Sequence, residues 1–227
     1  MIPRPPNPLI AALDVSDLDR AEVLARALEG EVALFKVGLE LFTAHGPAAV
    51  LRLRHRGLVF LDLKLHDIPN TVERAARNCA RMGVSIVTVH ALGGEAMVAA
   101  AVRGAARGAE ESGHPLPMIA AVTVLSSIGG EALASSASLA FEAMSAGATA
   151  AIVSGQDVSA VREVVGETFC LIVPGIRPAG SNGHDQVRIL TPEEAVERGA
   201  DYLVVGRAIA ESPDPAGAAR SILSSVR

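Results

Sequence analysis

Hydrophobic positions along the chain follow two alternating patterns. Short runs rich in Val, Ile and Leu are typical of strands buried in a parallel sheet. Longer stretches rich in Ala and Arg repeat their apolar positions every three or four residues, which is typical of amphipathic helices. The short runs predict strands at Leu9–Val15, Ala33–Val37, Leu58–Leu65, Ser85–His90, Met118–Leu125, Ala150–Ser154, Cys170–Pro174 and Tyr202–Val205. The longer stretches predict helices at Leu18–Leu28, Glu40–His55, Asn70–Met82, Glu95–Ser112, Leu133–Ala146, Val158–Val164, Pro192–Arg198 and Pro215–Val226.

The regular alternation of strand and helix predicts an α/β fold without a break in composition. Such a chain forms either a closed parallel barrel or an open doubly wound sheet. Eight units in a chain of 227 residues favour a single-domain (β/α)8 TIM barrel that spans residues 1–227. Asp17 and Thr191 are expected to cap the helices that follow them, and Thr191 precedes a proline and two acidic residues.

Charged residues stand at the carboxyl ends of several predicted strands, where a buried parallel strand should be apolar. Asp14 follows the first strand, Lys36 lies in the second, Asp62 and Lys64 lie in the third, and His90 ends the fourth. In a barrel these ends meet at one rim, where the loops build the active site. The sequence therefore predicts a catalytic site at this rim.

The third strand is the most informative, because Asp62 and Lys64 are two residues apart. Their side chains should leave one face of the strand, while Leu61, Leu63 and Leu65 leave the other. A neighbouring carboxylate favours the ammonium form of lysine. Lys64 is therefore expected to act as an acid, not as a base or a Schiff-base amine, and this points to a reaction that generates a carbanion.

Composition strengthens this interpretation and excludes other classes. Of the 20 basic residues, 18 are Arg and only Lys36 and Lys64 are Lys; a lysine ammonium can surrender a proton whereas a guanidinium cannot. A net charge of −5 and an aromatic content of 3% with no Trp give no basis for expecting a nucleic-acid partner or an anionic membrane. Two cysteines, Cys79 and Cys170, are too few for a disulfide framework or a structural zinc site.

The chain also shows no signal peptide and no apolar run near the ~20 residues of a membrane span, so we expect a cytoplasmic protein. A phosphate site is expected after the last two strands, where barrels often bind phosphate with backbone N–H groups. Gly206 and Arg207 follow the eighth strand, and Arg177 and Gln186 belong to the loop after the seventh.

Eight segments resemble the orotidine 5′-phosphate decarboxylase family and occur in the family's order between about residues 10 and 216. The most specific is FLDLKLHDIPNTV; the others are ALDVSD, FKVGLELF, TVHALGG, AVTVLSS, PGIRPAGS, DQVRILTP and DYLVVGRAI. The resemblance implies a TIM-barrel carboxy-lyase of de novo pyrimidine biosynthesis that converts orotidine 5′-phosphate to UMP and CO2 without a cofactor or a metal.

The resemblance also implies roles for individual residues. Lys64 would donate the proton to C6 of the pyrimidine, and Asp62 would lie beside the departing carboxylate. Asp67, with Ile68 and Thr71, would reach the active site of a second subunit, which implies a homodimer with shared sites. Lys36 and Asp14 would bind the ribose hydroxyls, with Lys36 also part of the catalytic charges. Ser126 and Ser127 would lie near the base, and the phosphate would be held by Arg177, Gln186, Gly206 and Arg207.

Two departures and two alternatives accompany the resemblance. Ser126 stands where the family motif has Thr, which affects the placement of that hydroxyl, and the region 128–148 is about ten residues shorter than in some members. One alternative is a magnesium-dependent sugar-phosphate decarboxylase or synthase of the same superfamily, which Lys36 in the site opposes. The other is a barrel that binds phosphorylated ligands without catalysis. His66 and His90 lie near the rim, where hydrogen bonding to neighbouring residues is their expected role.

Overall fold

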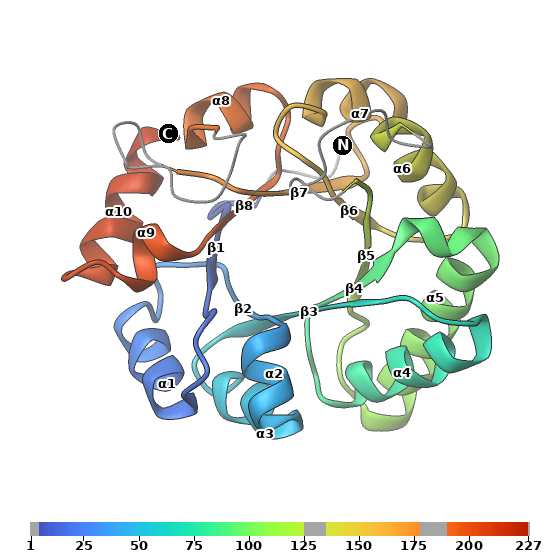
Figure 1. Cartoon of the computed structure of the whole chain (residues 1–227), viewed down its shortest axis with the longest axis horizontal. Coiled ribbons are helices and arrows are strands. Elements are labelled where there is room, and N and C mark those ends of the chain that lie inside the picture. Colours follow the sequence, from blue (N-terminus) through green and yellow to red (C-terminus); the bar gives the residue numbers. More distant parts are fainter. Residues whose placement is uncertain (1–4, 125–134, 178–189, 227) are drawn as a thin grey trace.

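Eight parallel strands close into a barrel in the order β1 to β8, and helices surround the strands (Figure 1). The structure is a computed structural model that describes residues 5–124, 135–177 and 190–226. The predicted fold class, a TIM barrel, is therefore confirmed. The strands are β1 Leu9–Ala12, β2 Leu34–Val37, β3 Leu58–Leu65, β4 Ile86–His90, β5 Met118–Val122, β6 Ala150–Ile152, β7 Cys170–Pro174 and β8 Tyr202–Val205.

The helices match the predicted positions with three exceptions, and the predicted start of one helix, Leu133, lies outside the described residues. They are α1 Leu18–Ala27, α2 Leu39–His45, α3 Pro47–Leu53, α4 Pro69–Arg81, η1 Ala91–Gly93, α5 Gly94–Ser112, α6 Ser136–Ser145, α7 Val158–Val165, α8 Pro192–Glu197, α9 Arg207–Ala210 and α10 Pro215–Ser225. The single helix predicted from Glu40 to His55 is wrong, because Gly46, with φ of 59° and ψ of −144°, breaks it before Pro47. The short helices η1 and α9 were not predicted.

Two helix starts have the caps that the sequence predicts. The Asp17 side chain accepts a hydrogen bond from the Arg20 backbone N–H at the start of α1. Thr191 and Glu194 form a reciprocal capping box at the start of α8. Within the part of the chain that the structure describes, no helix combines the length and the apolar character needed to cross a membrane. The cytoplasmic location stays a prediction.

The core has two layers that the strands separate. The inner layer fills the barrel with alternate strand residues, and the outer layer packs the other strand residues against the helices. The inner layer consists of Ile10, Ala12, Leu34, Phe60, Ile86, Ala120, Ala150, Ile172 and Val204. Inward positions two residues further along β1, β2 and β3 are charged, as in the pairs Ala12/Asp14, Leu34/Lys36 and Phe60/Asp62. The strands therefore deliver apolar side chains to the middle of the barrel and charges to its rim.

Strand β3 is irregular at the point where it carries the catalytic candidates. It advances four residues, from Leu61 to Leu65, while β4 advances two, from Val87 to Val89. Within this bulge Lys64 has φ of 51°, and it is the one non-glycine residue with positive φ in the described ranges. Leu61 still belongs to the outer layer, and Leu63 and Leu65 pack against it. The predicted sidedness is thus confirmed, but a bulge replaces the regular strand that was expected.

The two cysteines are both free, Cys79 buried in the outer layer and Cys170 partly buried at the start of β7. Burial raises the pKa of Cys79 to about 11 and that of Cys170 to about 12. Both thiols therefore stay protonated near neutral pH, as expected of small packing residues.

Helix α4 follows the rim loop of β3, and its position depends on close packing against α5. A Cβ atom on Gly104 would lie 2.0 Å from the carbonyl oxygen of Glu73, and one on Gly108 would lie 2.2 Å from that of Arg77. These distances are incompatible with any side chain, so both glycines allow the two backbones to touch.

Substitution Gly104→Ala should therefore force α4 and α5 apart. We expect it to lower the free energy of unfolding by about 1–3 kcal/mol, the usual effect of overpacking, as measured by urea denaturation. The matched control is Ala106→Ser on the exposed face of α5, which should change the free energy by less than about 0.5 kcal/mol. Equal effects of the two substitutions would contradict this account of the helix contact.

Candidate active site

Four charged side chains of alternating sign meet at the rim, and we call Asp14, Lys36, Asp62 and Lys64 the charge array. Lys36 Nζ lies 2.8 Å from Asp14 Oδ1 and 3.6 Å from Asp62 Oδ2. Lys64 Nζ lies 2.8 Å from both carboxylate oxygens of Asp62. Lys64 therefore points toward the barrel mouth, as predicted, and not outward into solvent.

The two central members of the array are shielded from water more than the two outer ones. The side chains of Lys36 and Asp62 are 10% and 13% exposed, whereas those of Lys64 and Asp14 are 32% and 53% exposed. Two cations and two anions give no net charge, and each buried charge has an opposite neighbour. This pairing is necessary, because a buried ion pair that loses one partner typically destabilises a protein by about 3–5 kcal/mol.

Thr88 and Gly38, which the sequence did not single out, support the array in different ways: Thr88 bonds it and Gly38 leaves room for it. Thr88 on β4 is fully buried, and its hydroxyl donates to Asp62 Oδ1 at 3.0 Å and accepts from the Lys64 backbone N–H at 2.8 Å. Gly38 follows β2, where a Cβ atom would lie 2.8 Å from Asp14 Oδ1 and 3.1 Å from Lys36 Nζ. A polar residue at an inward position of the apolar run IVTVH was the signal that could have identified Thr88.

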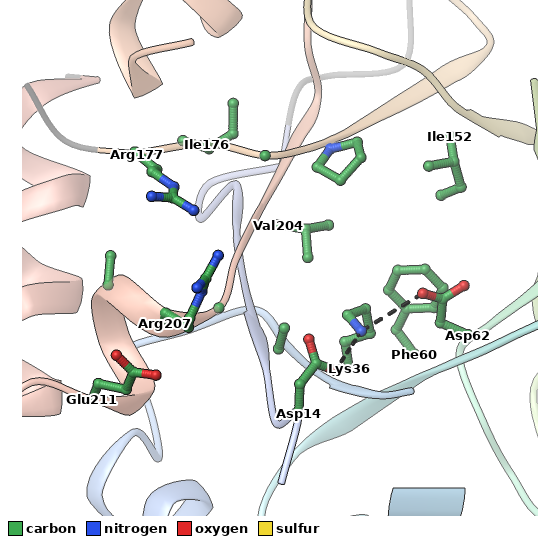
Figure 2. A pocket seen from close by; sticks show the side chains of 15 residues that line it. Asp14, Lys36, Phe60, Asp62, Ile152, Ile176, Arg177, Val204, Arg207 and Glu211 are labelled. Atoms are coloured by element: carbon green, nitrogen blue, oxygen red, sulfur yellow. Dashed lines mark hydrogen bonds and ion pairs between the residues drawn. The ribbon is translucent and has the colours of Figure 1, made fainter. Parts of the chain in front are cut away.

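A cavity of about 460 Å³ opens beside the array. Asp14, Lys36 and Asp62 line one side of it, and Lys64 adjoins it through its bonds to Asp62. Arg177 after β7 and Arg207 after β8 line the part of the cavity away from Asp62, with their guanidinium groups turned toward one another (Figure 2). The volume is in the range of small-molecule sites, and the two guanidinium groups suit an anion such as phosphate.

The predicted phosphate residues are only partly described. Gly206 lines the cavity and precedes α9, which has four residues. A helix this short has a weak dipole, so its N-terminus contributes little to anion binding. The two guanidinium groups are therefore the main evidence for an anion site. Ile176 forms a parallel bridge with Leu190, and the Arg177 N–H donates to the Leu190 carbonyl, which fixes the start of the loop after β7. Gln186, and likewise Ser126 and Ser127, lie outside the described residues.

The residues expected to act in a second subunit do not join the array within one chain. Asp67 and Ile68 in the loop between β3 and α4, and Thr71 in the first turn of α4, are all exposed. The Asp67 carboxylate accepts a hydrogen bond from the Ile68 N–H at 2.6 Å. The array of one chain thus contains one carboxylate in contact with Lys64, that of Asp62.

The two rim histidines stack on one another, with ring centroids 5.2 Å apart and an interplanar angle of 24°. The Nδ1 atom of His90 is buried and has no hydrogen-bond partner among the described residues, so the expected hydrogen-bonding role is wrong for this nitrogen. Burial lowers the pKa of His90 from its ordinary value of 6.5, and the nearby positive charges of His66 and Lys64 lower it further. His90 is therefore neutral at pH 7.

The described residues contain no group of three or more His, Cys, Asp and Glu side chains placed to hold a metal ion. The charge array has two carboxylates, and the Lys36 ammonium lies between them. A cation in this position would repel a divalent metal ion.

Comparison with known proteins identifies the family of the chain. Residues 7–222 match the model of the family described as "Orotidine 5'-phosphate decarboxylase / HUMPS family". The chain belongs to this family. The family resemblance found in the sequence is thereby confirmed.

Individual members support the same assignment. A protein of Anaeromyxobacter sp. strain K named orotidine 5′-phosphate decarboxylase is 50% identical, over 96% of this chain and 98% of its own length. One of the same name from Moorella thermoacetica is 46% identical, over 96% of this chain and 91% of its own. The crystal structure of orotidine 5′-phosphate decarboxylase from Lactobacillus acidophilus superposes with a TM-score of 0.84 at 35% identity and covers 97% of this chain and 99% of that one.

The lowered pKa of His90 predicts a pH-dependent stability. Between the lowered folded-state value and 6.5 the unfolded chain binds more protons at this site, so the stability contributed by neutral His90 is present above pH 6.5 and is lost as the pH falls. Urea unfolding at pH 8 and pH 5.5 should show a larger loss of stability for the wild type than for His90→Phe, which keeps an aromatic ring against His66. Parallel losses in the two proteins would refute the assignment to His90.

Proposed function

We infer that the protein decarboxylates orotidine 5′-phosphate to UMP and CO2, a step of de novo pyrimidine biosynthesis. The observation that carries this inference is the Lys64 ammonium, bound by both oxygens of Asp62 beside a cavity with two guanidinium groups on its far side. The family membership and the names of relatives at 46% and 50% identity support it.

In the proposed complex, the phosphate, the ribose and the pyrimidine of the substrate each contact a different group of cavity residues. Its phosphate lies between Arg177 and Arg207, next to the backbone of Gly206, and Gln186 completes this site. The ribose hydroxyls bond Asp14 and Lys36, whose Nζ–Oδ1 distance of 2.8 Å brings a donor and an acceptor together. The pyrimidine then lies over Asp62 and Lys64, with Ser126 and Ser127 near its polar edge.

The reaction needs one proton and no redox change. The bond between C6 and the carboxylate carbon breaks, CO2 leaves, and the electron pair stays on C6. The Lys64 ammonium stabilises this developing negative charge and then donates a proton to C6, which gives UMP. Lys64 is one-third exposed, so water can return the proton after each cycle.

Binding at a distance from the reacting carbon contributes to the rate. The phosphate and ribose contacts hold C6 against Lys64. The binding free energy of these contacts therefore offsets the entropy that is lost when C6 and the ammonium are brought together. Asp62 holds Lys64 with two hydrogen bonds and lies where the substrate carboxylate would be, so it favours departure of that group as CO2.

Magnesium-dependent sugar-phosphate chemistry in the same superfamily is the nearest alternative. The description of the family model joins two names and does not separate these activities. Two features favour the decarboxylase: the Lys36 ammonium between Asp14 and Asp62, and the printed names of the relatives. A barrel that only binds phosphorylated ligands would have no use for the Lys64–Asp62 pair.

Purified protein with excess EDTA should consume orotidine 5′-phosphate, observed as loss of the orotate absorbance. Substitution Lys64→Ala should lower kcat by more than about a thousandfold. The matched variant Lys64→Arg keeps a cation but cannot release a proton, and it should be similarly inactive. Both variants should retain the circular dichroism spectrum of the wild type. Substantial turnover by folded Lys64→Ala would refute the proton-donor assignment, and dependence on magnesium would favour the alternative enzyme.

We further propose that two copies of the chain form a homodimer with shared active sites. Three large apolar side chains are exposed at the rim, namely Leu39 at 51%, Ile68 at 66% and Leu92 at 56%. They follow the adjacent strands β2, β3 and β4, so they gather on one side of the site and suit burial against a second copy. Asp67, Ile68 and Thr71 in this region would then reach the partner's array.

A shared site predicts complementation between two inactive variants. In a hybrid of Lys64→Ala and Asp67→Ala chains, one site combines an intact Lys64 with an intact Asp67 from the other chain. Random mixing should therefore restore about a quarter of the wild-type activity, because half of the dimers are hybrids with one working site in two. Mass-tagged chains monitor subunit exchange, and no recovery after demonstrated exchange would exclude a shared site.

A further inference from the structure

The bulge in β3 leaves Lys64 outside the regular pairing of the sheet. Register pairs join β3 and β4 at Leu61↔Val87 and resume at Leu65↔Val89. Thr88 lies between Val87 and Val89, opposite the bulge, and on its other side it pairs in register with Ala120 of β5. The backbone of Thr88 is thus held by β5, while its side chain faces the irregular segment of β3.

Where the bulge interrupts the backbone pairing of β3 with β4, the Thr88 side-chain hydroxyl bonds β3 instead. It accepts the Lys64 backbone N–H at 2.8 Å and donates its own proton to Asp62 Oδ1 at 3.0 Å. Thr88 is 0% exposed, so water cannot substitute for the hydroxyl. One oxygen atom therefore connects the backbone of the lysine to the carboxylate that binds the lysine ammonium.

This connection matters because the backbone at Lys64 is held in an uncommon conformation. A non-glycine residue with φ of 51° is less stable than one in the extended region and persists only when its surroundings require it. The Thr88 bond to the Lys64 N–H and the Asp62 bonds to the Lys64 ammonium hold the residue from its two ends. Release of the Thr88 bond would allow the backbone to relax and would move Nζ.

We propose that Thr88 is a positioning residue for the decarboxylation, which holds the Lys64 backbone and the Asp62 carboxylate in a single fixed arrangement. This inference rests on the proposed function. It adds a residue that belongs to neither of the two groups proposed to bind the phosphate and the ribose. Thr88 acts through Lys64 and Asp62, so its removal should affect kcat more than substrate binding.

The test compares Thr88→Val with Thr123→Val. Valine has the shape of threonine without its hydroxyl. Thr123 is an equally buried threonine on the adjoining segment after β5, and its hydroxyl donates to the Ile152 carbonyl at 2.9 Å, away from the charge array. Thr88→Val loses the two hydrogen bonds of its hydroxyl and Thr123→Val loses one, so a purely structural effect should lower the free energy of unfolding of both proteins without a selective fall in kcat.

For Thr88→Val we expect kcat to fall about ten- to a hundredfold, the effect of misplacing a reacting group by about 1 Å. The KM for orotidine 5′-phosphate and the Kd for UMP should change less than about threefold, because these depend mainly on the phosphate and ribose contacts. Thr88→Ser should recover most of kcat, and Thr123→Val should keep it. An equal kcat for the two valine variants, or an effect on KM alone, would overturn the inference.

A second measurement does not depend on turnover. Amide hydrogen exchange at Lys64 should be at least about tenfold faster in Thr88→Val than in the wild type and unchanged in Thr123→Val. Unchanged protection at Lys64 would overturn the inference even if kcat fell. Absence of turnover by the wild type would instead refute the proposed function, and the exchange experiment would still decide the role of Thr88. Should Thr88→Val fail to fold, Thr88→Ser and Thr88→Cys give the same comparison, because they match in size and differ in hydrogen bonding.

Discussion

The contact between the Lys64 ammonium and the two oxygens of Asp62 is the interaction on which the site depends. Asp62 is mostly buried and also lies 3.6 Å from Lys36, so it binds the two lysines of the chain at once. A carboxylate in this position without its cations would be strongly destabilising. The arrangement that serves catalysis is therefore the one that allows charges to enter the end of an apolar barrel.

In the cavity, the residues proposed to bind the phosphate lie apart from those proposed to react with the substrate. The guanidinium groups of Arg177 and Arg207 come from the ends of β7 and β8, whereas Asp62 and Lys64, the proposed reacting groups, come from β3 (Figure 2). Strands on opposite parts of a closed barrel are held at a fixed separation, so a ligand bound at one end is aligned at the other without further adjustment. In the proposed reaction, binding of the phosphate would thus orient the bond that breaks.

The rigidity of the rim comes from ordinary packing beneath it. Gly104 and Gly108 let α4 and α5 touch backbone to backbone, and α4 begins at the loop that carries Asp67 and Ile68. Thr88 follows Ile86 on the inward face of β4, and its hydroxyl bonds the Lys64 backbone N–H of β3 at the bulge. Under the proposals made above, helix packing and one buried hydroxyl together position the Asp62 and Lys64 side chains of β3.

The sequence by itself determined the barrel, the rim as the candidate site, and the pairing of Asp62 with Lys64, because these follow from periodicity along the chain and from residue chemistry at the strand ends. It did not reveal the break at Gly46, the helix α9, the positive φ of Lys64 or the role of Thr88. The break at Gly46 has a local cause, the backbone of Gly46 before Pro47, whereas the positive φ of Lys64 and the hydrogen bonds of Thr88 depend on how β3 and β4 align. The tertiary structure decided these two features, because a register shift between two strands is a property of both in contact and leaves no mark in either segment alone.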